Sequence, residues 1–190
     1  MPRFVRRSFK ASLCRLLPKR LARRFVREEE ASAAVEFALV AAPFLALLFA
    51  IMETAFVFFA GQALETATAD ASRLIMTGQA QTAKFSKADF KTEVCNRIFG
   101  LFDCANGIYI DVKSYGNSAP ATPTSPVTNG TLNTAGMTYN TGGPGDIVVV
   151  SLYYEWPVYV TMLGNNLSNL NGSKRLLAAT AVFRNEPYDG

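Results

Sequence analysis

One feature constrains this chain of 190 residues more than any other: residues 37–60 form an apolar run in which only Glu53 is charged. A helix needs about 20 apolar residues to cross a bilayer, and this run supplies 24. Its 13 Leu, Ile, Phe and Val residues favour insertion by roughly 4–8 kcal/mol, whereas one acid at the centre costs about 2.5–3.5 kcal/mol. Pro43 is tolerated in a span when the freed backbone group finds another partner. The run therefore predicts a transmembrane helix.

A cleaved secretory signal is the alternative interpretation of the same run. The apolar region of such a signal has only about 7–15 residues, and its basic region is short. Here the apolar run is longer, and the basic segment before it fills residues 1–27. Both lengths favour a retained span over a signal peptide.

Charge is distributed unevenly on the two sides of the run. Residues 1–30 contain 10 Lys and Arg against 3 Glu, a balance of +7, while residues 31–190 contain 9 Lys and Arg against 12 Asp and Glu, a balance of −3. The positive-inside rule places the basic arm in the cytoplasm and the C-terminal part outside. A basic arm is also typical of nucleic-acid binding. Because a span follows directly, we interpret it as a topogenic segment beside anionic lipid and predict no nucleic-acid partner.

Periodicity outlines an α+β fold after the span. Apolar residues continue at helical spacing through Leu64, Ala71 and Ile75, which predicts one long helix over residues 32–77. Ser86 and Asp89 form a near capping box that begins a second helix. Three β-rich runs follow, at residues 108–115, 147–154 and 176–184. The second is continuously apolar, which is typical of a central strand.

These patterns predict three parts. Residues 1–31 form a basic cytoplasmic arm or leader, and residues 32–78 form a transmembrane and projecting helix. Residues 79–190 form a small periplasmic domain of helix and antiparallel sheet. Within this domain, 23 of the 30 residues at 116–145 are Gly, Pro, Ser, Thr or Asn and none is charged, which predicts a long exposed loop.

The cysteines and the absent residue types limit the chemistry. Cys95 and Cys104 fall in the part predicted to face an oxidising compartment, where disulfides persist. A redox pair or a metal site is the alternative, but the spacing is not CxxC and no other ligand is near, so we favour a structural disulfide. The chain contains no histidine, which excludes imidazole bases and imidazole metal ligands. We predict no catalytic residue, no metal site, no cofactor and no enzymatic activity.

The entry to the span carries a short motif. Residues 31–37 read ASAAVEF, so that Glu36 stands at the edge of the apolar run and Phe37 follows it. A carboxylate at the start of a span is costly and needs a partner or a function. The segment resembles the prepilin peptidase motif of type IV pilins and pseudopilins. That resemblance implies cleavage between Ala31 and Ser32, with Glu36 as the fifth residue of the mature chain; the usual glycine before the cut is Ala31 here.

Further motifs extend the resemblance from about residue 23 to the C-terminus. They are the AAVEFAL entry, the second acid Glu53, a cysteine pair like Cys95 and Cys104, and segments like those at 108–115, 142–150, 154–157 and 183–188. In combination they resemble the TadE/TadG-like family of the tight-adherence (Tad, or Flp) pilus system. The resemblance implies a bacterial inner-membrane, single-pass minor pilin or pseudopilin that passes into a surface pilus on assembly.

The same resemblance implies roles and partners. Glu36, Phe37 and Glu53 would take part in assembly. The partners would be other pilins or pseudopilins of the same pilus, a prepilin peptidase, the platform protein, the secretion ATPase and membrane lipid, with adhesion or biofilm formation as the outcome. Two other classes stay open: a bitopic envelope protein whose periplasmic domain binds a partner without entering a filament, and a membrane-tethered periplasmic enzyme.

The charge asymmetry generates a topology prediction. A reporter that is active only outside the cytoplasm, fused after Gly190, should be active, because the basic arm holds the N-terminus inside. The same reporter placed before residue 1 is the control and should be inactive. A stable but inactive C-terminal fusion would reverse the predicted orientation.

Overall fold

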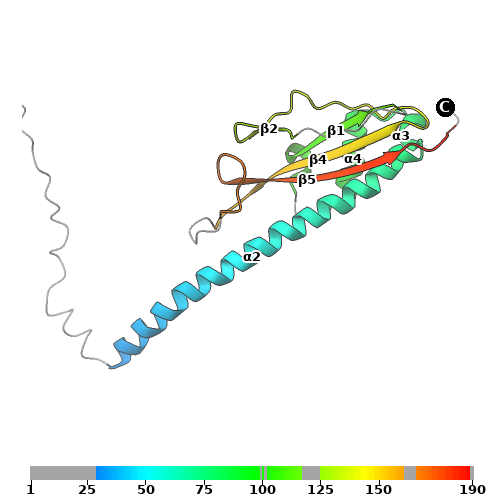
Figure 1. The fold of residues 1–190 in the computed structure, drawn as a ribbon. Coiled ribbons are helices and arrows are strands. Elements are labelled where there is room, and N and C mark those ends of the chain that lie inside the picture. The colour runs from blue at the N-terminus through cyan, green and yellow to red at the C-terminus, as the bar shows by residue number, and fades with distance from the viewer. Residues whose placement is uncertain (1–28, 99, 101, 117–124, 161–165, 189–190) are drawn as a thin grey trace, which may run out of the picture. The chain divides into compact units, whose positions relative to one another are not determined.

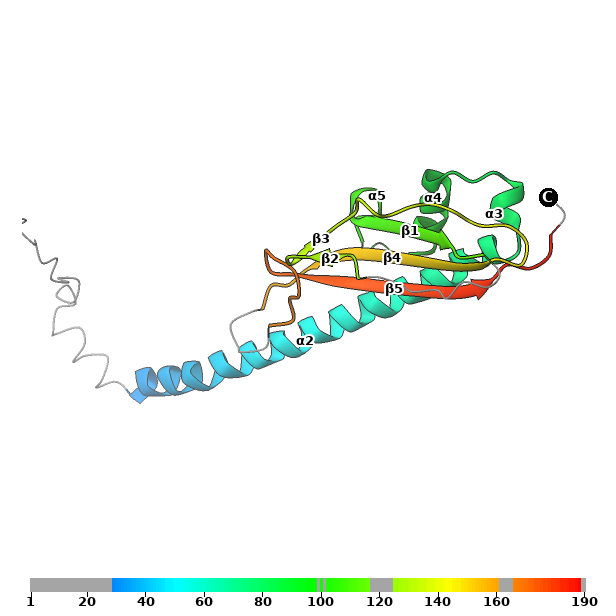
Figure 2. The same cartoon turned by 45° about the horizontal axis from the view of Figure 1, so that its top comes forward.

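The computed structural model describes residues 29–98, 100, 102–116, 125–160 and 166–188. The chain divides into two compact units, residues 1–48 and residues 49–190, and each is described by itself. The basic arm at residues 1–28 lies outside the described residues. Figures 1 and 2 together label the elements, which are α2 (Glu29–Met76), α3 (Gln79–Thr82), α4 (Lys87–Arg97), α5 (Cys104–Gly107), β1 (Ile108–Ser114), β2 (Val127–Thr128), β3 (Thr131–Leu132), β4 (Ile147–Pro157) and β5 (Lys174–Arg184).

Helix α2 confirms the predicted long apolar helix and begins three residues earlier than expected. Among the described residues it is the one helix long and apolar enough to cross a membrane, with a mean hydropathy of 2.3 in its most apolar window and none of that window buried. Pro43 lies inside the helix. In the first unit, every described side chain from residue 33 to 48 is exposed or half-exposed. The apolar face of this part of α2 is therefore not covered by its own unit.

Helix α2 ends at Met76, one residue before the predicted end, and Gly78 follows shortly after it. Its φ of +77° is left-handed, a conformation that glycine adopts without steric cost. The ring of Tyr188 also lies against it, and a Cβ on this residue would stand 2.3 Å from the Tyr188 Cγ atom. A side chain at this position would be strained and would displace Tyr188.

The second unit contains an antiparallel sheet with the strand order β1-β4-β5. Val112 of β1 stands opposite Val150 of β4, which in turn stands opposite Ala181 of β5. Residues 148–154 of β4 are all buried, which confirms the central position predicted from its continuous apolar run. All three predicted strands are present within a few residues of their expected bounds. The fold is the expected α+β combination of a long apolar helix and a small domain with short helices and an antiparallel sheet.

The core of the second unit lies between the sheet and α2, as the two views in Figures 1 and 2 show. The helix contributes a buried stripe at three- and four-residue steps, consisting of Val57, Ala60, Leu64, Ala67, Thr68, Ala71 and Ile75. Three of these residues are alanine, which lets the backbone of α2 approach the sheet. The sheet contributes Ile110, Val112, Val148, Val150 and Leu152. Burying each Leu or Ile stabilises the fold by roughly 1.5–3 kcal/mol.

Helix α4 begins at the predicted cap. The Ser86 hydroxyl accepts a bond from the Asp89 backbone N–H at 3.2 Å, and the Asp89 carboxylate accepts one from the Ser86 N–H at 2.8 Å. This is a capping box with aspartate in the place of glutamate. The bonds from Ser86 lower the pKa of Asp89 below its usual value. Phe90 and Val94 face the core from this helix.

The segment at 116–145 is less open than its composition predicts. Its described part contains the two-stranded hairpin β2–β3, and residues Thr138 and Asn140 bond to the backbone of Val112 on the free edge of β1. Tyr139 packs on the core with its ring 5.7 Å from that of Phe90. Burial raises the pKa of Tyr139 to about 12. Thr138 and Asn140 are nevertheless exposed and Tyr139 is half-buried, so the described part of this segment lies on the surface, with one aromatic side chain packed against the domain.

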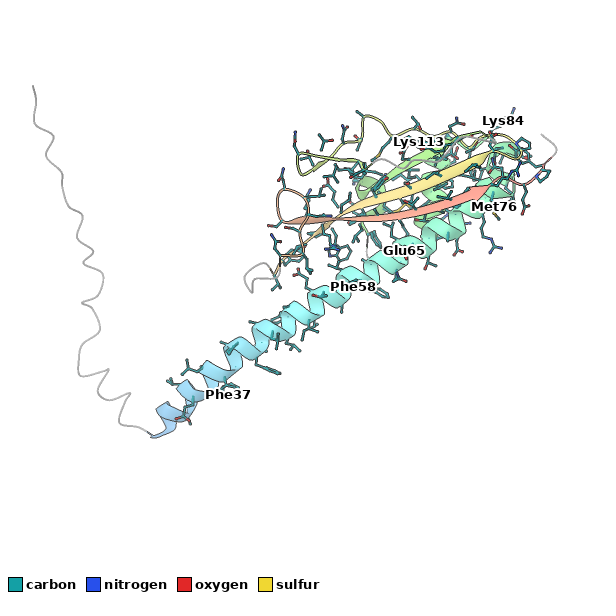
Figure 3. All side chains as sticks on the ribbon, viewed as in Figure 1. Phe37, Phe58, Glu65, Met76, Lys84 and Lys113 are labelled. Atoms are coloured by element: carbon teal, nitrogen blue, oxygen red, sulfur yellow. A yellow bond between two sulfur atoms is a disulfide. The ribbon has the colours of Figure 1, made fainter. Side chains whose placement is uncertain are left out.

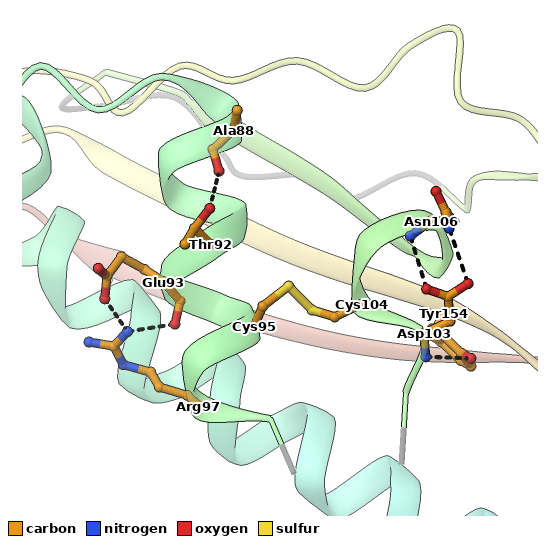
Figure 4. Close-up of a disulfide and its surroundings, with 9 residues drawn as sticks. All are labelled: Ala88, Thr92, Glu93, Cys95, Arg97, Asp103, Cys104, Asn106 and Tyr154. Atoms are coloured by element: carbon orange, nitrogen blue, oxygen red, sulfur yellow. Dashed lines mark hydrogen bonds and ion pairs between the residues drawn. A yellow bond between two sulfur atoms is a disulfide. The ribbon is translucent and has the colours of Figure 1, made fainter. Parts of the chain in front are cut away.

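The cysteine pair is joined as the sequence analysis favours. A disulfide links Cys95 at the end of α4 to Cys104 at the start of α5, with the two Cα atoms 5.7 Å apart (Figure 4). Beside it, Phe102 packs edge-on against Tyr154 with ring centroids 4.8 Å apart. The Tyr154 hydroxyl accepts a bond from the Asp103 backbone N–H. The disulfide and these contacts thus hold the segment before β1 against the aromatic side chains at the end of β4.

The disulfide generates a stability prediction. Replacing Cys95 and Cys104 together by serine should lower the free energy of unfolding by about 2–3 kcal/mol, because the bridge closes a loop of roughly ten residues in the unfolded chain. Urea unfolding of the full-length protein in detergent measures this, with the fluorescence of Trp156 as the probe. The ring of Trp156 lies 5.9 Å from that of Phe102, next to the bridge.

Cys14→Ser is the matched control and should leave the unfolding curve unchanged. Peptide mapping without reductant should recover Cys95 linked to Cys104. Two free thiols at these positions, alkylated before lysis, would contradict the pairing in cells.

Candidate functional site

The strongest candidate for a functional surface is the bare apolar side of α2. Its large side chains stand out from the helix with exposed fractions of 40–74%. They are Val35, Phe37, Leu39, Val40, Phe44, Leu45, Leu47 and Leu48 in the first unit, and Phe49, Ile51, Met52, Phe56, Phe58 and Phe59 in the second. Figure 3 labels Phe37 and Phe58 on this helix. So many exposed large apolar side chains in each unit indicate a lipid-facing or protein-facing surface.

The residues of the predicted processing motif all lie on α2. Ala31 and Ser32 stand in its first turn. Glu36 is exposed, and Phe37 is 74% exposed, the most exposed of the large apolar side chains on the helix. Glu36 and Phe37 are thus accessible within their own unit, and the roles of the motif in processing and assembly stay predictions.

Glu53 has partners in its own chain that the sequence does not reveal. Its carboxylate accepts hydrogen bonds from the backbone N–H groups of Tyr159 and Val160, the second at 2.9 Å. Glu53 lies four residues before Val57, on the same side of α2 as the buried stripe. Its bonds to Tyr159 and Val160 thus lie one helical turn before Val57, the first buried residue of that stripe.

The sequence indicates that Glu53 needs a hydrogen-bond partner, but it does not indicate which groups provide it. An acid inside an apolar run needs a partner, and this is the signal that the sequence carries. The partners are backbone amides more than 100 residues further along the chain, and amides are common to every residue type except proline. No composition or spacing rule points to Tyr159 and Val160. This contact lies within one chain, and the assembly role of Glu53 stays a prediction.

The C-terminal motifs of the sequence meet at the end of α2. Asn185 is 3% exposed, and its amide nitrogen donates to the carbonyl groups of Thr141 and Gly143, both at 2.9 Å. The next residue, Glu186, donates its backbone N–H to the Met76 carbonyl at 2.8 Å. The 142–150 and 183–188 segments thus bind each other and satisfy an end carbonyl of the helix. Within the domain, these contacts hold the two segments together at the C-terminal end of α2.

The remaining polar groups form no reactive cluster within the described residues. No group of three His, Cys, Asp or Glu side chains there could hold a metal ion. The Lys113–Asp111 and Lys174–Glu155 ion pairs lie on the surface, and each carboxylate raises the pKa of its lysine. A hollow of about 350 Å³ between α4 and β1 is lined by apolar groups and by Lys87 and Lys91. Tyr109 and Thr134 also line it, and none of its lining residues is a carboxylate.

A comparison with known protein families gives a match, which lies on α2. Residues 31–73 match the family model described as TadE-like protein. The match covers α2 from its first turn and includes both Glu36 and Glu53, and it is shorter than the resemblance from residue 23 to the C-terminus that the motifs suggest. No curated protein and no solved structure matches the chain. Over residues 31–73, which make up most of its long apolar helix, this chain is similar to the TadE-like protein family.

Proposed function

We propose that the protein is a non-catalytic minor pilin or pseudopilin of a Tad/Flp pilus, which is anchored in the inner membrane and assembles through its N-terminal helix. The observation that carries the proposal is the family match on a helix whose apolar side chains are left uncovered. A helix that is apolar all round in its first half needs lipid or other helices around it. A pilin-like subunit meets both surroundings in turn.

The split character of α2 supports this assignment. From Val57 to Ile75, one side of the helix is buried in a core that it shares with the sheet of its own domain. From residue 33 to 52 no side chain is buried. About 20 residues of helix measure about 30 Å at 1.5 Å per residue, which matches the hydrocarbon core of a bilayer. The same bare length offers ridges and grooves to neighbouring helices once the subunit leaves the lipid.

The proposal includes the machinery that the family implies. A prepilin peptidase would remove residues 1–31, and a platform protein and a secretion ATPase would drive assembly with other pilins of the same pilus. The domain after residue 78 would face the periplasm and then the outside of the fibre. The bitopic envelope protein that never enters a filament is the competing model, and processing separates the two.

Processing is the first test. In a strain with an active prepilin peptidase the mature chain should begin at Ser32, contain 159 residues and carry a formal charge of −3. Intact-mass measurement of the membrane-extracted protein determines this directly. Ala31→Gly restores the usual residue before the cut and should increase the processed fraction. If the smallest form still contains residues 1–31 in both variants, the protein is an anchor and not a pseudopilin.

Glu36 is the proposed assembly residue, for an electrostatic reason. Processing leaves a new α-amino group four residues before it, and the unperturbed pKa of such a group is about 7.7–8.0. In surroundings of low dielectric constant the ammonium group and the carboxylate are each costly alone and compensate each other as a pair. A pair formed between neighbouring subunits would set the axial register of one helix against the next.

Glu36→Gln tests this role because it removes the charge and keeps the shape. We expect normal membrane insertion, an intact Cys95–Cys104 bridge and loss of nearly all sheared pilus protein, as in a strain lacking the gene. Glu65→Gln is the matched control: Glu65 is also exposed on α2, where it bonds to Gln62 of the same helix at 2.9 Å. This control should assemble normally. Normal piliation of Glu36→Gln would remove the assembly role.

A further inference from the structure

The contact between Glu53 and the segment after β4 joins two groups that are difficult to place. The chain leaves β4 at Pro157, and Val158 is held inward, 5% exposed, by donating its N–H to the Ser173 carbonyl at 2.8 Å. The next two N–H groups, of Tyr159 and Val160, donate to the Glu53 carboxylate. The side chain of Tyr159 turns away from the domain and is 82% exposed, more than any other large apolar or aromatic side chain described.

This contact lies within the band of bare apolar side chains of α2. Within the same compact unit, Phe49, Ile51 and Met52 precede Glu53, and Phe56, Phe58 and Phe59 follow it. The exposed apolar surface thus continues about 9 Å along the helix beyond Glu53, at 1.5 Å per residue. Whatever covers these phenylalanines also reaches the level at which Tyr159 stands.

In apolar surroundings, the Glu53 carboxylate and the two backbone N–H groups each need a hydrogen-bond partner, and here they bond to each other. An acid within a span costs about 2.5–3.5 kcal/mol on an insertion scale. Backbone N–H groups in hydrocarbon cost several kcal/mol each when they have no partner. Bonds between them satisfy both amides and both carboxylate oxygens, and bonds to a charged acceptor are among the strong ones. In water neither group would need the other.

We propose that the chain at Tyr159 and Val160 enters the lipid on the exported side of the membrane, with Tyr159 as an interfacial anchor and Glu53 as the residue that positions the segment. The proposal rests on the membrane insertion included in the proposed function. Tyrosine is enriched at the bilayer surface because its ring is apolar and its hydroxyl group is polar. The domain would then rest on the bilayer at a defined height and not hang from it on a free stalk.

A single-tryptophan experiment tests the lipid contact. Trp156 is the only tryptophan, so Trp156→Phe gives a silent background into which Tyr159→Trp is introduced. The full-length protein is reconstituted into phosphatidylcholine vesicles with and without bromine on the acyl chains, which quenches tryptophan in contact with lipid. We expect Tyr159→Trp to lose most of its emission in the brominated vesicles.

Two further reporters in the same background calibrate the result. Phe44→Trp, on the bare helix, should be quenched. Val182→Trp, 57% exposed on β5 at the opposite end of the sheet from Pro157, should not be quenched. Quenching at Phe44 but not at Tyr159 would overturn this inference and leave membrane insertion standing. Absence of quenching at both would overturn insertion and with it the proposed function.

The positioning role of Glu53 has a separate readout. Glu53→Gln removes the negative charge and replaces one of the two acceptor oxygens by an amide donor, so the bonds to the Tyr159 and Val160 amides weaken, and amide hydrogen exchange of these residues in the vesicles should become several-fold faster. Quenching of Tyr159→Trp should decrease in the same variant. Glu65→Gln on the same helix should change neither. Unchanged exchange in Glu53→Gln would show that the carboxylate does not hold the segment.

Discussion

The packing of the α2 stripe against the sheet is the contact on which the rest of the domain depends. Leu64 and Ile75 are fully buried, and they belong to the same core cluster as Val150 and Leu152 of β4. The large side chains of the sheet, such as Ile110 and Leu152, fill the space that the alanines leave. Since α2 provides the only helix of more than eleven residues among those described, the sheet has no comparable alternative cover on that face. Substitutions that enlarge Ala60 or Ala71 would separate the two layers.

The two ends of this contact are closed by different devices. At the C-terminal end of the helix, Gly78 accommodates the ring of Tyr188, and Glu186 satisfies the Met76 carbonyl. At the other end, where the stripe stops at Val57, the carboxylate of Glu53 takes up two backbone amides. Between them, the disulfide fixes α4 against the start of β1. The domain is thus tied to the helix by polar contacts at the limits of an apolar interface.

Local signals predicted the elements well, because each of them depends on residues close in sequence. The run at 147–154 showed a central strand by its unbroken apolar character, and Ser86 with Asp89 showed where α4 begins. Sequence reasoning failed where the contact is distant and the partner is backbone. Nothing in the polar stretch at 116–145 indicated that Tyr139 packs on Phe90. Nothing near Glu53 indicated that Tyr159 and Val160 satisfy it, and Asn185 gave no sign that it would be buried.

The two acids of the helix, Glu36 and Glu53, differ in how their cost of membrane insertion is met. The apolar residues at 37–60 favour insertion by roughly 4–8 kcal/mol, and two uncompensated acids at about 2.5–3.5 kcal/mol each would cancel most of that gain. Glu53 lies well inside the run and is satisfied by its own chain, so its cost is met at folding. Glu36 lies at the edge of the run, where an acid costs least. Glu53 bonds to backbone amides more than 100 residues away in the same chain. Glu36, on the proposed function, takes part in assembly, so that folding and assembly use different carboxylates of the same helix.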